Sequence, residues 1–306
     1  MRVTILAGGL GGSRFARALA ETIAPADLAV VGNVGDDLNV FGLHVSPDLD
    51  TILYTLAGVL DEEQGWGRAG ETWNALSTAE ELGGEAWFRL GDRDLGLHLV
   101  RTEALRAGER LSALTARLAR SLGVETRILP ATDDRLRTWV ETPAGELSFQ
   151  DWFVRRRHRD EVDGLRFEGA DQATAAPGVL EALAEADLIA IAPSNPLVSI
   201  GPIVAVGEIR SALERRRVPA VAVSPLIGGR TVRGPADRML ARLAGGTGPA
   251  QVTDCYKGLI DALVIDMADA DEPAGIRTIV TRTLMRDAES RRRLAEAVLE
   301  TAVALR

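Results

Sequence analysis

The chain has 306 residues, a formal net charge of −9 and only 4% aromatic residues. Cys255 is the only cysteine and Lys257 the only lysine, which excludes an internal disulfide, an iron–sulfur cluster, a Cys-x-x-Cys redox pair and a Gly-Lys-Ser/Thr phosphate loop. The acidic balance argues against general nucleic-acid binding, and no apolar run approaches the roughly 18 residues of a membrane span.

The first sixty residues predict two strand–loop–helix units. A β-branched run at 2–7 leads into the glycine-rich segment 8–13, after which apolar residues recur at helical spacing. A second strand is expected at 28–31, ending in the polar segment 32–37. A helix is expected from residue 46, where Ser as N-cap and Pro at the first helical position are typical of a helix start.

The middle of the chain is less regular. Residues 61–125 are predicted to be mostly helical, with the clearest apolar periodicity at 95–105 and 111–122. Short strands are expected at 138–141, 147–149 and 165–167, with a hairpin turn between the first two. We interpret about 61–174 as a helical and irregular insertion.

The α/β rhythm returns after residue 177. Strands are predicted at 187–192, 219–223, 262–266 and 276–282. Helices are predicted at 178–185, from about 202, near 235–244 and at 286–304. This alternation predicts one α/β domain over 1–306 with a Rossmann-like, mostly parallel sheet, helices on both faces, and a core of about 1–60 and 175–306.

Four polar loops follow predicted strands, at 8–13, 32–37, 193–199 and 224–229. Ligands of open α/β sheets bind beyond the carboxyl ends of the strands, so these loops are candidate binding elements. The glycines of the first loop either let backbone amides approach a phosphate or only tighten the turn. Dinucleotide binding is disfavoured, because Arg14 stands where a third glycine is needed and no acid ends the second strand.

Four carboxylates, Asp36, Asp37, Asp48 and Asp50, fall within fifteen residues. Asp48 alone is explained as a partner of a helix dipole, but the acidic pair in the preceding loop is not. Carboxylates from two loops beside a phosphate-type glycine loop suit Mg²⁺, which takes one or two protein carboxylates together with substrate phosphates.

Other motifs each have two interpretations. Ser194, Asn195 and Ser199 either donate to an anion or belong to a proline-stiffened capping loop. Asp92 and Asp94 are expected as helix caps. The basic run 155–159 is a solvated face or an anion contact. The tryptophans are ordinary core or the wall of a flat apolar pocket; they are Trp66, Trp73, Trp87, Trp139 and Trp152.

The same loops resemble those of 2-phospho-L-lactate transferase, and the resemblance covers most of the chain. Its most specific parts are Asn33-Val34-Gly35-Asp36-Asp37 and Ser46-Pro47-Asp48-Leu49-Asp50-Thr51. Further matching segments are 8–15, 54–56, 91–95, 192–196, 199–200, 224–225 and 234–237.

The resemblance implies an activity. The family joins Fo, the riboflavin-like precursor of coenzyme F420, to a phosphorylated three-carbon acid taken from a guanosine-diphosphate-linked donor, and releases GMP. The segments 65–67, 71–74 and 87–88 look most like the branch whose donor carries enolpyruvate and whose product is dehydro coenzyme F420-0. Lactyl and glyceryl donors stay open.

The resemblance also implies roles for individual residues. Asp36 and Asp50 would hold Mg²⁺ and act in catalysis, with Asp50 or a neighbouring carboxylate taking the proton. The donor would be held by Gly8, Gly9, Gly11, Gly12, Ser13, Ser194, Asn195 and Ser199. The insertion would line the Fo pocket together with Asn33, Thr51, Asp92 and Asp94. Arg233, expected at the donor, stands where the family pattern suggests Lys, and the two cations are not equivalent.

The expected partners are therefore Fo, the guanylated donor and GMP or GDP, and a homodimer is usual for the family. One cysteine and no secretory signal lead us to expect a cytoplasmic location, with no nucleic-acid or membrane partner. The alternative is a nucleotide-sugar-binding regulator of a related fold. The segment 46–51 favours the transferase.

Overall fold

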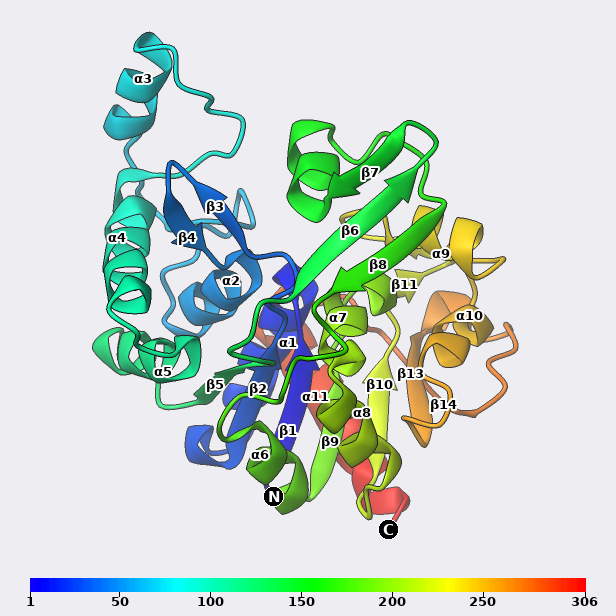
Figure 1. Ribbon diagram of the computed structural model, residues 1–306. Coiled ribbons are helices and arrows are strands. Elements are labelled where there is room, and N and C mark those ends of the chain that lie inside the picture. Colours follow the sequence, from blue (N-terminus) through cyan, green and yellow to red (C-terminus); the bar gives the residue numbers. More distant parts are fainter.

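The computed structural model describes residues 1–306 and has a seven-stranded, all-parallel central sheet (Figure 1). The strands, in the order in which they pair, are β14 (Arg277–Thr281), β13 (Ala262–Asp266), β10 (Ala220–Val223), β9 (Leu188–Ile191), β1 (Val3–Ala7), β2 (Leu28–Gly32) and β5 (Arg127–Pro130). The predicted Rossmann-like α/β class is confirmed. All of these strands except β5 were predicted.

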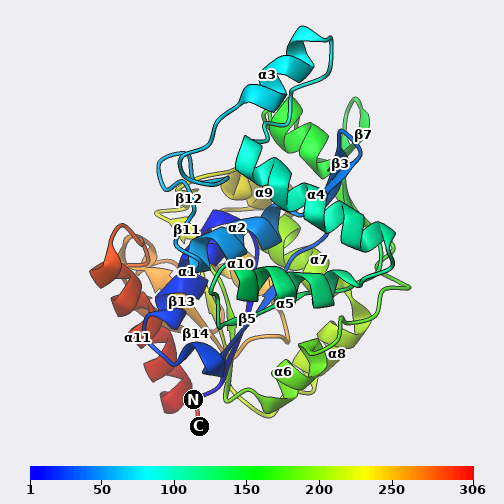
Figure 2. The ribbon, with the colours of Figure 1, turned by 90° about the vertical axis from the view of Figure 1, so that its left-hand side faces the viewer.

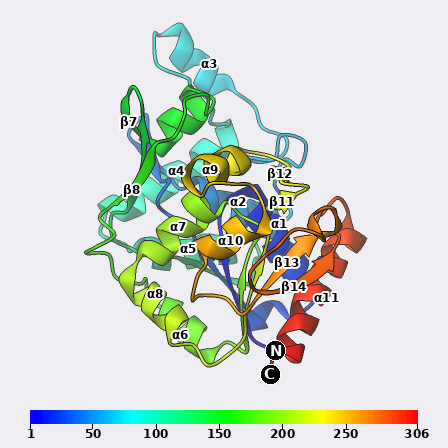
Figure 3. The same ribbon diagram turned by 90° about the vertical axis from the view of Figure 1, so that its right-hand side faces the viewer.

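Helices cover both faces of the sheet, which explains why its inner strands read as continuous apolar runs. Every residue of β1 and of β2 is buried. Figures 2 and 3 show α1 (Gly9–Ala20) and α11 (Ala288–Ala304) on one side, and α6 (Val179–Glu185) and α8 (Gly207–Glu214) on the other.

The strand order reverses beside β1. The chain passes from β1 outward through β2 to β5, and then returns to β9 on the opposite side of β1, where Val3 lies level with Leu188. Such a switch point leaves a crevice outside the carboxyl ends of the two central strands, and this crevice is where α/β folds bind ligands.

The predicted insertion comes in two pieces, because β5 returns to the central sheet between them. The first piece follows α2 (Pro47–Leu56) and contains α3 (Asn74–Glu81), α4 (Asp92–Arg106) and α5 (Leu111–Ser121). The second contains the three expected short strands, β6 (Arg137–Thr142), β7 (Gly145–Ser148) and β8 (Gly164–Glu168), which pair as one small sheet.

The expectation of a mostly helical 61–125 is wrong for 61–73 and 82–91, which form turns and irregular backbone. Glycines with positive φ, among them Gly65, Gly67 and Gly70, interrupt helix formation there. In Figures 1 to 3, α3 stands away from the body of the protein, at the end opposite the two chain termini.

Two small hairpins were not predicted. They are β3 (Leu38–Val40) with β4 (Leu43–Val45), and β11 (Leu226–Ile227) with β12 (Arg230–Thr231). The second hairpin replaces part of the expected loop 224–229. Gly228 and Gly229 turn it with φ of 60° and 70°, as a two-residue hairpin turn of this kind requires.

Short helices complete the chain, and the helix expected from residue 202 is broken between α7 and α8. They are α7 (Gly201–Ala205), α9 (Ala236–Leu243), α10 (Pro249–Cys255) and the single turns η1 (Pro25–Asp27), η2 (Asp151–Arg155), η3 (Pro196–Ile200) and η4 (Met267–Asp269).

None of the helices is, taken alone, long and apolar enough to cross a membrane. One pair, Pro196–Ala205 with Gly207–Glu214, reaches that length and composition only jointly and is bent by 94°.

Candidate active site

A cavity of about 720 Å³ opens at the switch point, lined by the segments that follow β1, β9 and β10. Most of the residues predicted for the site line it: Gly8, Gly9, Gly11, Asp36, Asp50, Thr51, Asp94, Ser194, Asn195, Ser199 and Arg233. The others lie outside its wall: Gly12, Ser13, Asn33 and Asp92. The structure therefore brings most of the predicted set to one place, while the roles of these residues stay predictions.

The glycines after β1 allow three segments to approach one another. A methyl group at Gly8 would lie 2.5 Å from Asp48 Oδ2, and one at Gly11 would lie 2.5 Å from the carbonyl oxygen of Pro193. Gly8 is the N-cap of α1, whereas Gly9 and Gly11 lie in its first turn rather than in a loop before it, and Gly9 has a φ of 63°. Close backbone approach is the reason why residues with side chains do not fit at Gly8 and Gly11.

The loops after β1 and β9 are joined by Ser194. Its hydroxyl donates to the Gly8 carbonyl oxygen at 2.8 Å, and the Gly8 amide donates back to Ser194 Oγ at 3.4 Å. Asn195 caps η3 by accepting from the Leu197 amide at 2.9 Å. The capping interpretation of this loop is therefore correct for Asn195, while Ser199 lines the cavity.

Asp48 lies at the amino end of α1. Its Oδ1 accepts from the Gly9 amide at 2.9 Å and its Oδ2 from Asn33 Nδ2 at 2.9 Å. Burial raises the pKa of this carboxyl to about 6, partly offset by those two donors. Asn33 is fully buried and also accepts from the Gly35 amide at 2.8 Å, so it holds Asp48 and the acidic loop together from behind the cavity wall.

Asp36 is a buried acid beside other acids. Burial, followed by the negative charge of Asp48, raises its pKa well above the usual range. Its Oδ1 has no hydrogen-bond partner, and neither does Oδ1 of Asp37. A buried carboxylate cluster with unpartnered oxygens fits a cation supplied from outside the protein.

No three acidic, histidine or cysteine side chains are grouped closely enough to hold a metal ion by themselves. That arrangement still fits Mg²⁺, which keeps several waters and is commonly held by one or two carboxylates together with substrate phosphates. The donor set at this site consists of oxygens, and the unpartnered Asp36 Oδ1 belongs to it.

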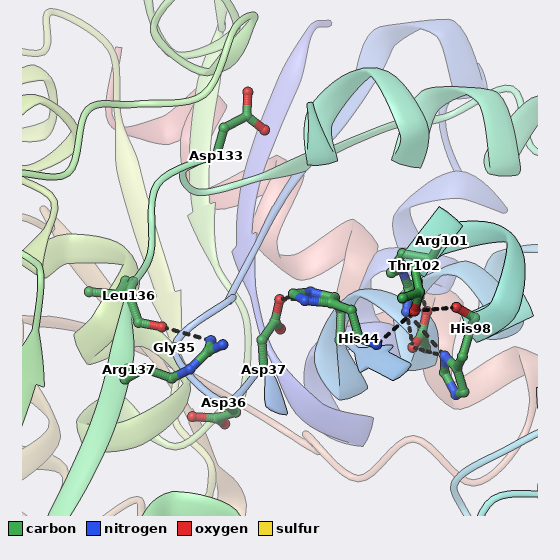
Figure 4. A network of polar contacts seen from close by, with 12 residues as sticks. Gly35, Asp36, Asp37, His44, His98, Arg101, Thr102, Asp133, Leu136 and Arg137 are labelled. Carbon is green, nitrogen blue, oxygen red and sulfur yellow. Dashed lines mark hydrogen bonds and ion pairs between the residues drawn. The ribbon is translucent and has the colours of Figure 1, made fainter. Parts of the chain in front are cut away.

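Asp50 is only two residues from Asp48 but has a different environment. Arg101 from α4 binds both of its carboxylate oxygens, Nη1 to Oδ2 at 2.9 Å and Nη2 to Oδ1. The Arg101 and Asp50 side chains are 2% and 8% exposed, so this is a buried ion pair. His98 Nδ1 lies 3.3 Å from Arg101 Nη1, and burial lowers the pKa of His98 to about 4, which leaves the ring neutral (Figure 4).

His44 joins α4 to the acidic loop. Its Nε2 lies 3.0 Å from Asp37 Oδ2, an oxygen that also accepts from Ser46 Oγ at 2.8 Å. The His44 amide donates to Thr102 Oγ1 at 2.8 Å (Figure 4). This network gives His44 a structural role and fixes Asp37 at one oxygen only.

The acids of the 91–94 segment have separate roles. Asp92 accepts from the Thr72 hydroxyl, the Asn74 side chain and the Ala75 amide, so it holds the start of α3 and lies outside the cavity wall. Glu71 in turn accepts from the amides at the start of α4. Asp94 lines the cavity, and burial raises its pKa to about 6. No contact joins Asp94 to His98, although their spacing allowed one.

Aromatic side chains form the part of the wall contributed by the first insertion piece. Trp66, Trp87 and Phe88 line the cavity, and Trp66 packs edge-on against Trp73 at 6.2 Å between ring centres. Trp152, in contrast, is core, with 1% of its surface exposed. The pocket interpretation is thus correct for two of the tryptophans, Trp66 and Trp87.

Sequence reasoning missed two parts of the wall. One is Phe149–Val154 around η2, and the other is Thr283–Met285 after β14. The second position had a signal, since it follows a predicted strand at the same sheet edge. The basic run 155–159, considered as a solvated face or an anion contact, contributes Arg157 and His158 to the wall. Arg233 was expected at an anion, but its guanidinium donates to the carbonyl oxygen of Gln64 at 2.9 Å and so ties the 61–67 turn to the hairpin region.

Fold and site together define an α/β protein of the Rossmann-like class with an oxygen-rich, acid-lined cavity at its switch point. The fold is shared with a Bacillus halodurans protein of known crystal structure, at a TM-score of 0.67 and 16% identity over 97% of this chain and 99% of that one.

Sequence comparison gives the family. The model of the family 2-phospho-L-lactate transferase CofD matches residues 3–302. The chain is 44% identical to the phosphoenolpyruvate transferase of Streptomyces griseus over 100% of both chains, and 45% identical to that of Kitasatospora aureofaciens over 100% of this chain and 99% of the relative. The corresponding Mycolicibacterium smegmatis protein is 38% identical over 99% of each.

The chain belongs to the 2-phospho-L-lactate transferase CofD family, and it is a transferase of coenzyme F420 biosynthesis.

Proposed function

We propose that the protein transfers enolpyruvyl phosphate from a guanosine-diphosphate-linked donor to the terminal ribityl hydroxyl of Fo, giving dehydro coenzyme F420-0 and GMP in a Mg²⁺-dependent reaction. Relatives named phosphoenolpyruvate transferase, at 44% and 45% identity, support the enolpyruvyl donor over a lactyl or glyceryl one. The observation that carries the proposal is that the acidic cluster, the glycine turn of α1 and the Ser194–Ser199 loop line one cavity.

The cavity offers a different chemistry to each part of the substrates. Its glycine-rich turn and serine loop at the switch point suit a diphosphate, because they provide amides and hydroxyls beside a helix start. Trp66, Trp87 and Phe88 provide an apolar wall that suits the flat ring system of Fo. The two binding regions meet at Asp36 and Asp50.

We assign Mg²⁺ binding to Asp36 and Asp50. Bound there, the ion would neutralise the diphosphate charge, and this lets an acidic protein take an anionic donor. The bidentate contact of Arg101 orients Asp50 and leaves lone pairs on both carboxylate oxygens for a further partner.

The reaction is a phosphoryl transfer. The ribityl oxygen forms a bond to the phosphorus that carries the three-carbon acid, and the bond from this phosphorus to the bridging oxygen breaks. GMP leaves with the bridging oxygen, and the hydroxyl proton passes to Asp50 or to a neighbouring carboxylate such as Asp48. Such a transfer requires positioning and charge neutralisation more than covalent participation by the protein.

The test is turnover of Fo with each of the three guanylated donors, with Mg²⁺ or with EDTA, and the product read by mass spectrometry. We expect dehydro coenzyme F420-0 with the enolpyruvyl donor and no product in EDTA. Asp36→Asn should be inactive and Asp171→Asn, which removes an exposed acid outside the cavity, should be fully active. Equal activity of wild type with and without Mg²⁺ would refute the metal assignment.

We also propose a homodimer in the cytoplasm, as expected from the sequence.

A further inference from the structure

Two consecutive residues beside the cavity have a backbone conformation that side chains disfavour. Arg157 has a φ of 56° and His158 a φ of 43°, and both line the cavity. The only other non-glycine residue with positive φ is Phe41, which turns the β3–β4 hairpin together with Gly42. Strained backbone of this kind persists where surrounding contacts enforce it, and it is concentrated at functional sites.

The contacts that enforce it are made by His158. Its amide donates to the Trp152 carbonyl oxygen at 2.8 Å, and its ring stacks on Phe153 at 5.2 Å between ring centres. Arg238 from α9 approaches it with Nη2, 2.8 Å from His158 Nδ1, and also donates to the His158 carbonyl oxygen. These contacts hold His158 in place and thereby direct Arg157, which precedes it.

Arg157 differs from the arginines next to it. Arg155 is paired with Glu85 at 2.6 Å and with Asp151, and Arg156 is paired with Asp160 at 3.1 Å. The guanidinium of Arg157 has no hydrogen bond, ion pair or aromatic partner within the protein. Within the 155–159 run, Arg157 and His158 are the two residues that line the cavity.

The other arginines of the cavity wall are engaged. Arg14 pairs with Glu62 at 3.0 Å, Arg89 lies 4.4 Å from the ring centre of Trp73, and Arg233 donates to the Gln64 carbonyl oxygen. Arg157 is therefore the cavity arginine whose guanidinium has no partner of any kind, since Arg89 is at least stacked on Trp73. The planar fork of Arg157 fits a carboxylate or a phosphate through two parallel hydrogen bonds.

The segment that carries Arg157 is fixed to the acidic side of the cavity. Gln150 Nε2 donates to the Asp36 carbonyl oxygen at 3.3 Å. Phe149 and Trp152 share a small apolar core with Val198 of η3. This attachment places the segment beside the acidic loop and the serine loop, where the reacting end of the donor would lie. Arg155 of the same segment also stacks on Trp87, 4.6 Å from its ring centre, so the segment spans from the acidic side to the aromatic wall.

We propose that Arg157 binds the carboxylate of the three-carbon acid. This inference rests on the proposed function. The diphosphate has other partners, namely the glycine turn, the serine loop and the proposed metal. For the carboxylate, Arg157 is the cavity arginine without a partner, while Arg89 is held against the Trp73 ring. The carboxylate is also common to the enolpyruvyl, lactyl and glyceryl units, so Arg157 recognises the acid without choosing among the three.

The test compares three deazaflavin ligands by fluorescence titration in the presence of Mg²⁺: Fo, the phosphate monoester of Fo at its ribityl hydroxyl, and coenzyme F420-0. Only the last has a carboxylate. We expect Arg157→Gln to weaken binding of coenzyme F420-0 by about 10- to 100-fold, the size of a lost charge-assisted hydrogen bond, and to leave the other two affinities unchanged. Arg156→Gln is the matched control and should change none of the three.

The possible outcomes are distinct. Weaker binding of the Fo phosphate ester by the same factor would show that Arg157 binds phosphate, and unchanged binding of all three ligands would show that it binds neither; both overturn the inference while leaving the proposed function intact. Wild-type protein that binds none of the ligands would overturn the proposed function and the inference with it. If Arg157→Gln does not fold, Arg157→Lys keeps the charge without the fork and should show a smaller loss, confined to coenzyme F420-0.

Discussion

Asp48 and Asp50 lie in the same helical turn but belong to different halves of the acidic wall. One half is Asp50, the other is Asp48 with Asp36, and the negative charge of each half is balanced differently. Asp50 is balanced inside the protein by Arg101, a buried cation on α4. Asp48 and Asp36 have only neutral donors, and burial raises the pKa of both. Asp50 thus has a cation of the protein beside it, whereas Asp48 and Asp36 have none. Four predictions test this contrast.

The largest expected effect is on the internally balanced half. Arg101→Met leaves Asp50 buried without a cation, and we expect the free energy of unfolding to fall by about 3–5 kcal/mol. Urea unfolding measures it. Arg106→Met on the same helix removes an arginine that contacts only the Gly42 carbonyl oxygen and should change little. If Arg101→Met is as stable as that control, the burial of Asp50 does not require the charge of Arg101.

In the half formed by Asp48 and Asp36, removing a charged side chain is expected to raise the free energy of unfolding. Asp36→Asn removes a buried negative charge next to Asp48, so metal-free protein should be stabilised by about 0.5–2 kcal/mol although turnover is lost. Thermal unfolding in EDTA, together with the turnover assay, checks both. Destabilisation of the metal-free variant would show that the protein itself already balances Asp36.

Asp94 provides a pH test of the same contrast. Its pKa is raised from 3.8 to about 6, so between these pH values the folded state holds a proton that the unfolded state has lost. Ionised Asp94 therefore costs stability at pH 7, on the order of 3 kcal/mol, and the cost is relieved as the pH falls through 6 toward 4. Asp94→Asn should be more stable than wild type at pH 7 in EDTA, and the difference should shrink by pH 4.5. A difference independent of pH would contradict the assignment.

Asp92 should give the smallest effect. It holds the start of α3 outside the cavity, so Asp92→Ala should lower protection of the first turn of α3 in hydrogen exchange, because the amides that it accepts from lose their partner. Binding of Fo should be unchanged within twofold. A large loss of Fo affinity would support the original expectation that Asp92 belongs to the Fo side.

The sequence predicted those features that depend on local pattern. Apolar runs located six of the seven central strands, and the polar loops that follow them located the cavity. The seventh strand, Arg127–Pro130, is a four-residue edge strand with an exposed arginine and a proline, and it has no such pattern. Its position depends on pairing with β2, which is a tertiary contact.

The site was predicted in composition but not in its pairing. Residue types showed that Asp36, Asp48 and Asp50 belong to one region, but only the fold reveals that α4 brings Arg101 to Asp50. Apolar periodicity at 95–105 predicted the helix itself, but the buried face of α4 also carries Arg101, His98 and Thr102, so periodicity did not identify Arg101 as an inward-facing residue. The strained backbone at Arg157 likewise depends on its neighbour His158, which Arg238 contacts from eighty positions later in the chain.

The most direct test of the central claim is the identity of the nucleotide released when purified protein is mixed with Fo, the enolpyruvyl diphosphoguanosine donor and Mg²⁺. Quantitative mass spectrometry should find one GMP for each dehydro coenzyme F420-0 formed, since the phosphorus that bears the acid is the one transferred. Release of GDP, or GMP formed without consumption of Fo, would contradict it.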